Sequence, residues 1–251
     1  DRTETANTQA YPTRCCPMAI DKARKKAKRK KNAAARAHTG GTSSLNHPTL
    51  LSAASSSQLD VLLRATSVAN PNPATAGIYQ DTHHLLVVGD GDCSFSLSLA
   101  TSMGARNRLV CTTYDSRGEL LSKYSQSAVI LKQLANLNVT VHHSVDCQLL
   151  HTDERINGAK YDRIVFNFPH VGGAKAEDVE MNKSILAEFF RSCAHLLNGT
   201  TAEVHVTLRD TPFYQSWKLQ QLANLAGLHL KKTEPFQIAS YPGCWYCNAL
   251  S

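Results

Sequence analysis

The 251-residue sequence lacks any apolar run of the roughly 18–20 residues that a membrane-spanning helix needs, so we expect no membrane span. It also lacks the apolar core of a secretory signal peptide near residue 1. Cysteine is too sparse for a disulfide scaffold, and we expect the eight scattered cysteines to be reduced thiols. Only Cys244 and Cys247 have metal-ligand spacing, which is half a zinc site, so we predict no metal site.

Net charge is almost absent from the larger part of the chain. Residues 81–251 contain 15 Lys and Arg against 16 Asp and Glu, whereas residues 1–80 contain 12 against 4. Nine of the fifteen residues in 22–36 are basic, so a helix there would be charged on every side. We interpret this run as a nuclear or nucleolar address or as an RNA-binding arm, with a merely solvated tail as the alternative.

Residues 39–80 are rich in Ser, Thr, Ala, Asn and Pro, a composition that buries too little apolar surface to offset chain entropy. We therefore predict a disordered basic leader and linker over residues 1–80. A single domain is predicted over residues 81–251.

Apolar segments of strand and helix length alternate within the predicted domain. The predicted strands are 85–88, 109–114, 139–145, 163–168, 203–208 and a sixth that begins at 228. The predicted helices are 94–102, 120–137, 178–197 and 213–226, the last closed by Gly227. This order predicts an α/β fold of the Rossmann-like, doubly wound type, with a mostly parallel sheet and helices on both faces. Ligands of such sheets bind outside the carboxyl ends of the strands, so the chemistry is expected in the loops after the first four strands.

The loop after the first predicted strand combines two glycines with two acidic residues. Glycines permit a sharp turn and a close approach of a ligand to the backbone before a helix. Ser94 replaces the third glycine of the dinucleotide fingerprint, and the carboxylates disfavour a pyrophosphate. They suit the sulfonium and ammonium groups of S-adenosylmethionine (SAM). The predicted cofactor-binding residues of this loop are Gly89, Asp90, Gly91, Asp92, Ser94 and Phe95.

Two further carboxylates end predicted strands. Asp115 ends the second strand, where a carboxylate can accept hydrogen bonds from the ribose hydroxyls of a nucleoside cofactor. Asp146 ends the third, where it can accept from an adenine amine. The alternative for each is a turn or helix-capping Asp.

The segment Asn167-Phe168-Pro169-His170 follows the fourth predicted strand. Methyltransferases of amino groups on bases carry an Asn/Asp-Pro-Pro-aromatic loop here, which presents a carbonyl to the target nitrogen and a ring for stacking. We predict that Asn167 orients the edge of a target base and that Phe168 packs against base or cofactor. His170 is expected to stack on the base or accept a proton. A simple strand-ending turn is the alternative.

Several strings together resemble one family. They are LLVVGDGDCSFSLSLA, TTYDS, FNFPHVGG, NKSILAEFF, VTLRDTPFYQSW and YPG, and they extend from Leu85 to Gly243. The chain resembles the uridine-N3 methyltransferase-like domain, a family known from modification of large-subunit ribosomal RNA in the nucleolus. The resemblance implies a Rossmann-like fold, SAM as methyl donor and a uridine of ribosomal RNA as substrate.

The sequence departs from this family at Cys93, which replaces an aromatic or similar residue, and after Gly243. There the family continues with an aromatic residue, a basic stretch and more sheet. We therefore expect the last antiparallel strand of the domain to be missing.

Together these features predict a SAM-dependent methyltransferase that acts on N3 of a uridine in ribosomal RNA, with His170 as the candidate base. One alternative is a non-catalytic RNA-binding ribosome assembly factor that retains a SAM-like pocket. Another is a methyltransferase with a different nitrogen target, such as a protein or an adenine amine. The expected partner is ribosomal RNA or a pre-ribosomal particle, and a monomer is favoured. The expected location is the nucleus or nucleolus, with the cytoplasm as the alternative.

Overall fold

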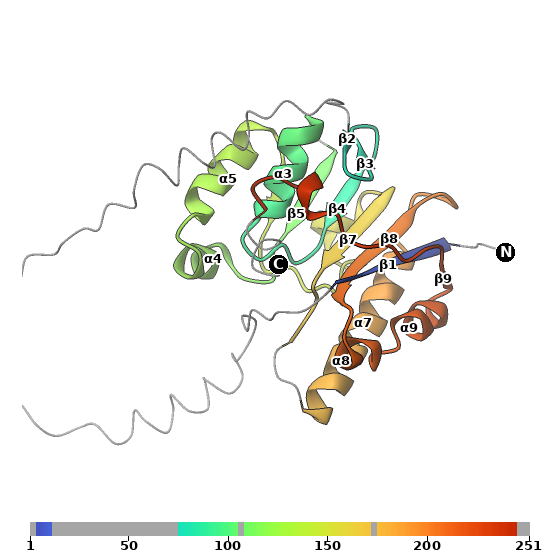
Figure 1. The fold of residues 1–251 in the computed structure, drawn as a ribbon. Coiled ribbons are helices and arrows are strands. Elements are labelled where there is room, and N and C mark those ends of the chain that lie inside the picture. The colour runs from blue at the N-terminus through green and yellow to red at the C-terminus, as the bar shows by residue number, and fades with distance from the viewer. Residues whose placement is uncertain (1–3, 12–74, 105–107, 172–174, 245–251) are drawn as a thin grey trace, which may run out of the picture.

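A computed structural model describes residues 4–11, 75–104, 108–171 and 175–244 (Figure 1). The basic run at 22–36 lies outside the described residues. A seven-stranded sheet has the order β6-β5-β4-β7-β8-β1-β9, and all its strand pairs are parallel. The strands are β1 (Glu4–Tyr11), β4 (Leu85–Val87), β5 (Leu109–Thr112), β6 (Thr140–His142), β7 (Arg163–Asn167), β8 (Glu203–Arg209) and β9 (Leu228–Leu230).

The chain changes direction across the sheet at β4. From β4 it proceeds to β5 and β6 on one side, and β7 and β8 then follow on the other side. The loops after β4 and β7 therefore emerge next to each other at the carboxyl edge, where ligands of such sheets bind. The predicted α/β fold with a mostly parallel sheet is confirmed.

Helices cover both faces of the sheet (Figure 1). One face carries α3 (Ser94–Met103), α4 (Arg117–Lys123) and α5 (Ser127–Asn136), and the other carries α7 (Ala176–Ala194), α8 (Pro212–Gln215) and α9 (Leu219–Leu225). A short α6 (Glu154–Asn157) precedes β7, and a 3-10 helix (Ile238–Ser240) follows β9.

The core has one layer on each side of the sheet, because successive strand side chains point to opposite faces. Leu85 and Val87 of β4 pack into the layer that contains Leu99 of α3, whereas Leu86 packs into the layer that contains Phe189 of α7. Burial on both faces explains why the strand is a continuous apolar run rather than an alternating one.

Two of the predicted helices are each broken in two. The segment 120–137 is interrupted at Tyr124, which has an extended backbone (φ −125°). The segment 213–226 is interrupted at Lys218, which is left-handed (φ 54°). Trp217 and Leu219 are both buried, and one continuous helix would direct side chains two positions apart to nearly opposite sides. Tertiary packing therefore overrides helical continuity there.

Two parts of segment 1–80 form strands, so the prediction of disorder is wrong for them. β1 pairs in parallel with both β8 and β9 and occupies the position between them. β2 (Thr75–Ala76) and β3 (Tyr79–Gln80) form an antiparallel hairpin whose Tyr79 is buried. The backbone N–H and C=O groups between β8 and β9 need partners whatever the side chains are, so the polar composition of β1 gave no signal.

The described residues also contain four free cysteines and one disulfide-bonded cysteine. Within the described part of the chain, no antiparallel strand joins the large sheet, no helix is long and apolar enough to span a membrane, and no group of three or more potential metal ligands gathers. Cys93, Cys111, Cys147 and Cys193 are free thiols. Cys244 is in a disulfide, so the expectation of reduced thiols is wrong for this residue.

Candidate active site

The loop after β4 is held in place by the neighbouring strand β5. Gly89 donates its N–H to the Thr112 hydroxyl at 3.2 Å, and the Asp90 N–H donates to the Thr112 carbonyl at 2.9 Å. Gly89 has φ +63°, and a Cβ on it would lie 2.9 Å from Cε2 of Phe166. Only glycine satisfies both the left-handed backbone and this close approach, so the loop has a fixed and crowded geometry.

Both acidic side chains of this loop bind the first turn of α3. The Ser94 N–H donates to Asp92 Oδ1 at 2.9 Å, and the Ser96 N–H donates to Asp90 Oδ2 at 2.8 Å. Phosphates are bound at helix N-termini by such N–H groups. Because the protein's own carboxylates occupy these two donors, this turn does not fit a dinucleotide pyrophosphate.

Asp90 is only 7% exposed. Burial raises the pKa of its carboxyl to about 7, and repulsion from the Asp92 carboxylate adds to the increase. A buried carboxylate that resists ionisation is stabilised in its charged form by a nearby cation. The loop therefore suits a positively charged ligand.

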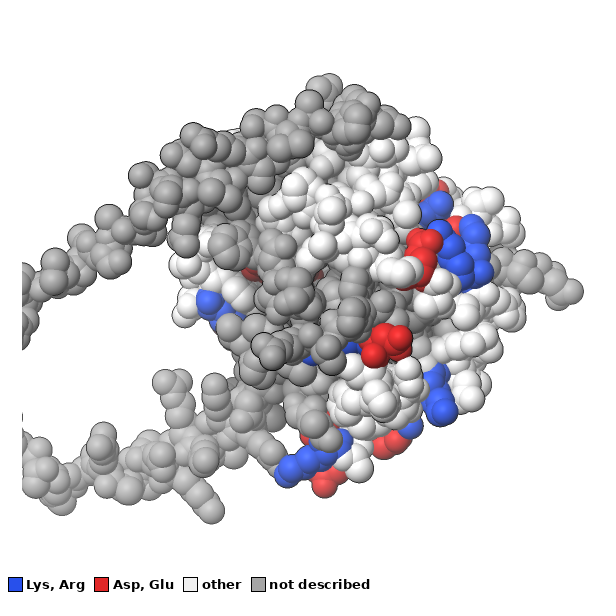
Figure 2. Space-filling view, viewed as in Figure 1, with Lys and Arg blue, Asp and Glu red and all other residues white. Residues whose placement is uncertain are grey.

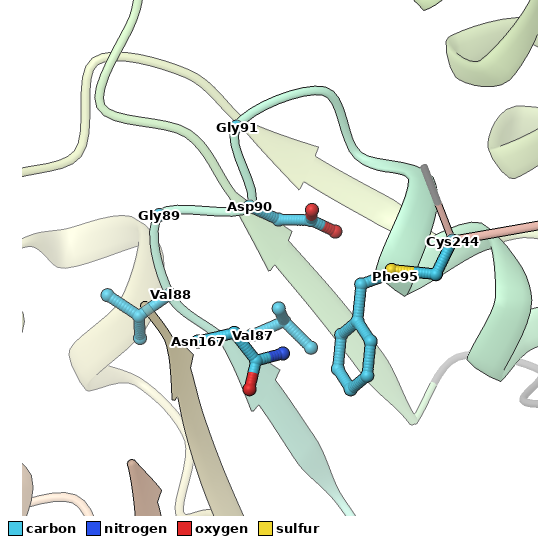
Figure 3. Close-up of a pocket in the computed structure, with 8 residues that line it drawn as sticks. All are labelled: Val87, Val88, Gly89, Asp90, Gly91, Phe95, Asn167 and Cys244. Atoms are coloured by element: carbon cyan, nitrogen blue, oxygen red, sulfur yellow. The ribbon is translucent and has the colours of Figure 1, made fainter. Parts of the chain in front are cut away.

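A small pocket lies between this loop and the end of β7. Figure 3 shows the Asp90 carboxylate, the Phe95 ring, the Asn167 amide and the Cys244 sulfur around this space. The lining residues are Val87, Val88, Gly89, Asp90, Gly91, Phe95, Asn167 and Cys244. Five of these eight are among the predicted site residues, and Val87, Val88 and Cys244 are not.

The segment after β9 forms one wall of the pocket. Tyr241 packs on Phe95 with ring centroids 5.0 Å apart, and Phe236 packs on Tyr241 at 5.0 Å. Phe236 also meets the edge of Phe168 at 6.1 Å. These contacts bring Cys244 to the pocket. This wall was not predicted from the sequence, where its signal is the pair of aromatic residues, Phe236 and Tyr241, before the Pro-Gly turn.

The two other predicted carboxylates lie outside the pocket lining. Asp115 is 8% exposed at the carboxyl end of β5, and its Oδ2 is 2.5 Å from the Lys123 ammonium. Asp146 Oδ1 accepts from the Gln148 N–H at 2.9 Å. This is the contact of an Asp in a local turn, the alternative to adenine binding given in the sequence analysis. Asp115 follows the strand next to β4, as a ribose-binding carboxylate would, and Asp146 has a local structural contact.

Asn167 ends β7 beside Thr207 of β8, its partner in the parallel register. The Thr207 hydroxyl donates to Asn167 Oδ1 at 2.7 Å. The amide oxygen is therefore turned toward β8, and Figure 3 shows the amide nitrogen on the side of Phe95. The group that Asn167 presents to the pocket is a hydrogen-bond donor.

The residues directly after Asn167 are not among those that line the pocket. Phe168 has φ +52°, a strained conformation for an aromatic residue, and its N–H donates to the Thr207 carbonyl at 2.8 Å. Strain of this kind clusters at functional sites. The buried Pro169 follows.

His170 lies among three aromatic rings contributed by α8 and the residues after it. Its ring centroid is 6.0 Å from Phe213, 5.9 Å from Tyr214 and 5.8 Å from Trp217. Burial lowers the pKa of His170, and the Asp178 carboxylate opposes the shift more weakly. The imidazole is thereby held neutral around pH 7 and is able to accept a proton.

The charges of the described residues are mixed on the face seen in Figure 2, where Lys and Arg lie among Asp and Glu. This agrees with the nearly neutral composition of residues 81–251. Long-range attraction of a polyanion is not explained by that face.

Residues 86–248 match the model of the family described as "rRNA (uridine-N3-)-methyltransferase BTM5-like". The chain belongs to this family. The matched range contains the loop after β4, the end of β7 and Cys244, so every residue that lines the pocket lies within it.

Relatives with names of several kinds match this chain. An uncharacterized protein of Arabidopsis thaliana is 32% identical over 66% of this chain and 81% of its own length. A mouse protein named "Ferredoxin-fold anticodon-binding domain-containing protein 1 homolog" is 34% identical over 63% of this chain but 27% of its own length. The yeast (Saccharomyces cerevisiae) 25S rRNA (uridine(2634)-N(3))-methyltransferase is 26% identical over 66% of each chain.

Proposed function

We propose that this chain transfers the methyl group of SAM to N3 of a uridine in large-subunit ribosomal RNA. Membership of the family supports methyl transfer to ribosomal RNA, and the yeast relative is named for this reaction. The observation that carries the choice of uridine is the orientation of Asn167, whose amide oxygen accepts from Thr207.

The loop after β4 fits the proposed cofactor by the chemistry of its donors. SAM supplies a methyl group on a positively charged sulfonium and also carries an ammonium group. The buried Asp90 carboxylate would hold the cationic end, and Gly89 allows close approach of the backbone. Asp115, at the end of the adjacent strand, would accept from the ribose hydroxyls. Asp146 is the proposed partner of the adenine amine, although its present contact is within its own turn.

The polarity of Asn167 favours uridine over an exocyclic amine. Uracil N3 is flanked by two carbonyl oxygens, which accept hydrogen bonds, whereas an amine target presents N–H donors. The amide of Asn167 would donate to a uracil carbonyl and place N3 toward the cofactor loop. Holding the nitrogen in line with the methyl carbon supplies much of the rate in such a reaction.

The N3 proton has to leave as the methyl group arrives. His170 is the proposed acceptor, since burial lowers its pKa and keeps it neutral. Phe168 and the ring cluster around His170 would bound the space for the target base, as nucleobases stack on aromatic side chains.

The proposed partner is ribosomal RNA or a pre-ribosomal particle, bound by a monomer in the nucleus or nucleolus. The basic run at 22–36 would supply the salt-sensitive attraction, because the described body carries charges of both signs (Figure 2).

The decisive experiment incubates purified full-length protein with labelled SAM and an unmodified transcript of large-subunit ribosomal RNA. Mass spectrometry of the nucleosides should detect 3-methyluridine with wild type and not with Asn167→Asp, whose side chain has only acceptors. Methylation of another base would support the different nitrogen target. SAM binding in calorimetry without any methyl transfer would support the non-catalytic assembly factor.

A further inference from the structure

Strand β8 carries a line of buried polar side chains on one face. Glu203, His205, Thr207 and Arg209 alternate with the apolar Val204, Val206 and Leu208, and all seven residues are at most 6% exposed. Alternation places the four polar residues on the same face. Asn167, which pairs with Thr207, shares this face.

Three members of this line make contacts that hold the fold together. Glu203 binds His205 at 2.9 Å and also contacts Lys231, and His205 binds the Tyr79 hydroxyl at 3.1 Å. Thr207 orients Asn167. Arg209 is the last residue of β8. It lies two residues beyond Thr207, toward the edge of the sheet where the ligand loops emerge.

The strand order places Arg209 on the far side of Asn167 from the cofactor loop. β7 separates β8 from β4, so β8 lies about 10 Å from β4 at ordinary strand spacing. A pyrimidine ring held by Asn167 would therefore have the cofactor loop on one side and Arg209 on the other.

We propose that the Arg209 guanidinium donates hydrogen bonds to a carbonyl oxygen of the target uracil and stabilises the negative charge that develops when N3 loses its proton. This inference rests on the function proposed above. N3 gives its proton to a base, its electron pair forms the bond to the methyl carbon, and the sulfur–carbon pair stays on the departing thioether. While N3 is deprotonated the charge spreads onto both flanking carbonyl oxygens, where a planar guanidinium is the strongest side-chain donor.

The titratable groups of the neighbouring strands and loops are as follows. On β1, Tyr11 is the register partner of Arg209, and Glu4, the one charged residue of that strand, is at the opposite end, next to the partner of Glu203. Glu203 lies six residues away along the strand, about 20 Å, and is bound by His205, Lys231 and Arg163. The Asp210 carboxylate accepts from Gln215 at 2.8 Å. Asn167 at the end of β7 and the following Phe168 are uncharged, and so are residues 235–244, which contain the aromatic wall of the pocket. On the cofactor side, Asp90 belongs to the loop after β4, which is two strands away from β8.

The test compares two transcripts of large-subunit ribosomal RNA, one with uridine and one with 5-fluorouridine, whose N3 is more acidic. Wild type, Arg209→Met and Arg209→Lys are assayed with both RNAs over a pH range from mildly acidic to mildly alkaline. Melting temperature and SAM affinity are measured for each protein. Arg191→Met, which removes an exposed cation on α7, is the control for loss of one positive charge.

We expect Arg209→Met to lose about 100-fold in kcat/KM on the uridine RNA at neutral pH, with SAM affinity unchanged. Its activity profile should move to higher pH, and the loss should shrink on the 5-fluorouridine RNA. The kcat/KM of Arg209→Lys should lie between those of wild type and Arg209→Met. If Arg209→Met does not fold, the same comparison is made with Arg209→Lys, whose loss of kcat/KM should be smaller on the 5-fluorouridine RNA than on the uridine RNA.

An equal loss on both RNAs at every pH would overturn the proposal, because it would show that Arg209 has a structural role. The absence of any loss would overturn it as well. A wild-type protein that makes no 3-methyluridine would refute the proposed function instead, so the two failures are distinguishable.

Discussion

The Thr207 hydroxyl and the Asn167 side-chain oxygen are joined by a 2.7 Å hydrogen bond between neighbouring strands. This contact determines which end of the amide faces the pocket. An Asn/Asp-Pro-Pro-aromatic loop is expected to present an acceptor to an amine, but here the Asn167 oxygen is bound by Thr207 and the amide nitrogen lies on the pocket side (Figure 3). In the proposed function, the same residue type at the same strand end would therefore donate to a target edge that carries acceptors.

Replacing Thr207 by Val should lower kcat about fivefold, because a hydrogen bond worth about 1 kcal/mol no longer fixes the amide. Thr207→Ser keeps the hydroxyl and should retain most of the activity. Both variants should bind SAM like wild type in calorimetry. Full activity of Thr207→Val would show that the orientation of Asn167 does not depend on this bond.

Asp90→Asn should stabilise the cofactor-free protein increasingly as pH rises. The pKa of this carboxyl is raised from 3.8 to about 7, so the folded state binds more protons than the unfolded state between these values, and wild-type stability falls as pH rises through them. One pKa unit corresponds to about 1.4 kcal/mol, so the gain in unfolding free energy above pH 7 is at most about 4 kcal/mol.

Urea unfolding on the acidic and the alkaline side of this pKa measures the gain, and calorimetry of the same variant should show weaker SAM binding. The Ser96 N–H can still donate to the amide oxygen that replaces the carboxylate oxygen, so the capping contact is kept. A stability difference that is the same at both pH values would contradict the assignment.

Asp115→Ala should weaken SAM binding by about 1–3 kcal/mol, through loss of charged hydrogen bonds to the ribose. Because Asp115 also contacts Lys123, Lys123→Met is the matched control. It removes the ion pair but keeps the carboxylate, and its SAM affinity should stay close to wild type. Equal weakening in both variants would assign Asp115 to the fold alone.

His170→Phe should keep the ring packing and the melting temperature but lower methyl transfer about 100-fold at neutral pH. Burial lowers the pKa of His170, so wild-type activity should already rise with pH below 6.5 and level off above it. The variant should lose this rise and recover partly at high pH, where uracil N3 deprotonates unaided. Unchanged activity of His170→Phe at neutral pH would leave His170 a packing residue.

Exchange of the nine basic residues in 22–36 for Gln should flatten the plot of log RNA affinity against log salt concentration, because fewer counterions are released. SAM affinity should not change, and β1 is retained because residues 4–11 are untouched. Filter binding to the ribosomal transcript at several salt concentrations measures the slope. An identical slope would place RNA binding on the folded body.

The sequence predicted those parts of the site that depend on local signals. The apolar run at 85–88 and the following glycines indicated a buried strand and a tight turn, and both are present with Gly89 left-handed. Asn167 was expected at the end of its strand and lies there in the pocket. Its donor orientation was not predictable, because it depends on Thr207, which is distant in the chain.

Long-range packing accounts for the remaining differences. The residues near Lys218 do not predict a helix break, because the break follows from the burial of both Trp217 and Leu219. Arg209 just follows a predicted alternating strand, and its significance depends on the strand order that places it beside Asn167.

The aromatic wall formed by Phe236 and Tyr241 has a consequence for synthesis on the ribosome. The cofactor loop is translated early in the domain, but the rings that cover Phe95 come near its end. A nascent chain can therefore assemble β4, β5 and β7 before its pocket has a complete lining. Cofactor affinity should thus appear late in translation, when the segment through Cys244 has left the exit tunnel.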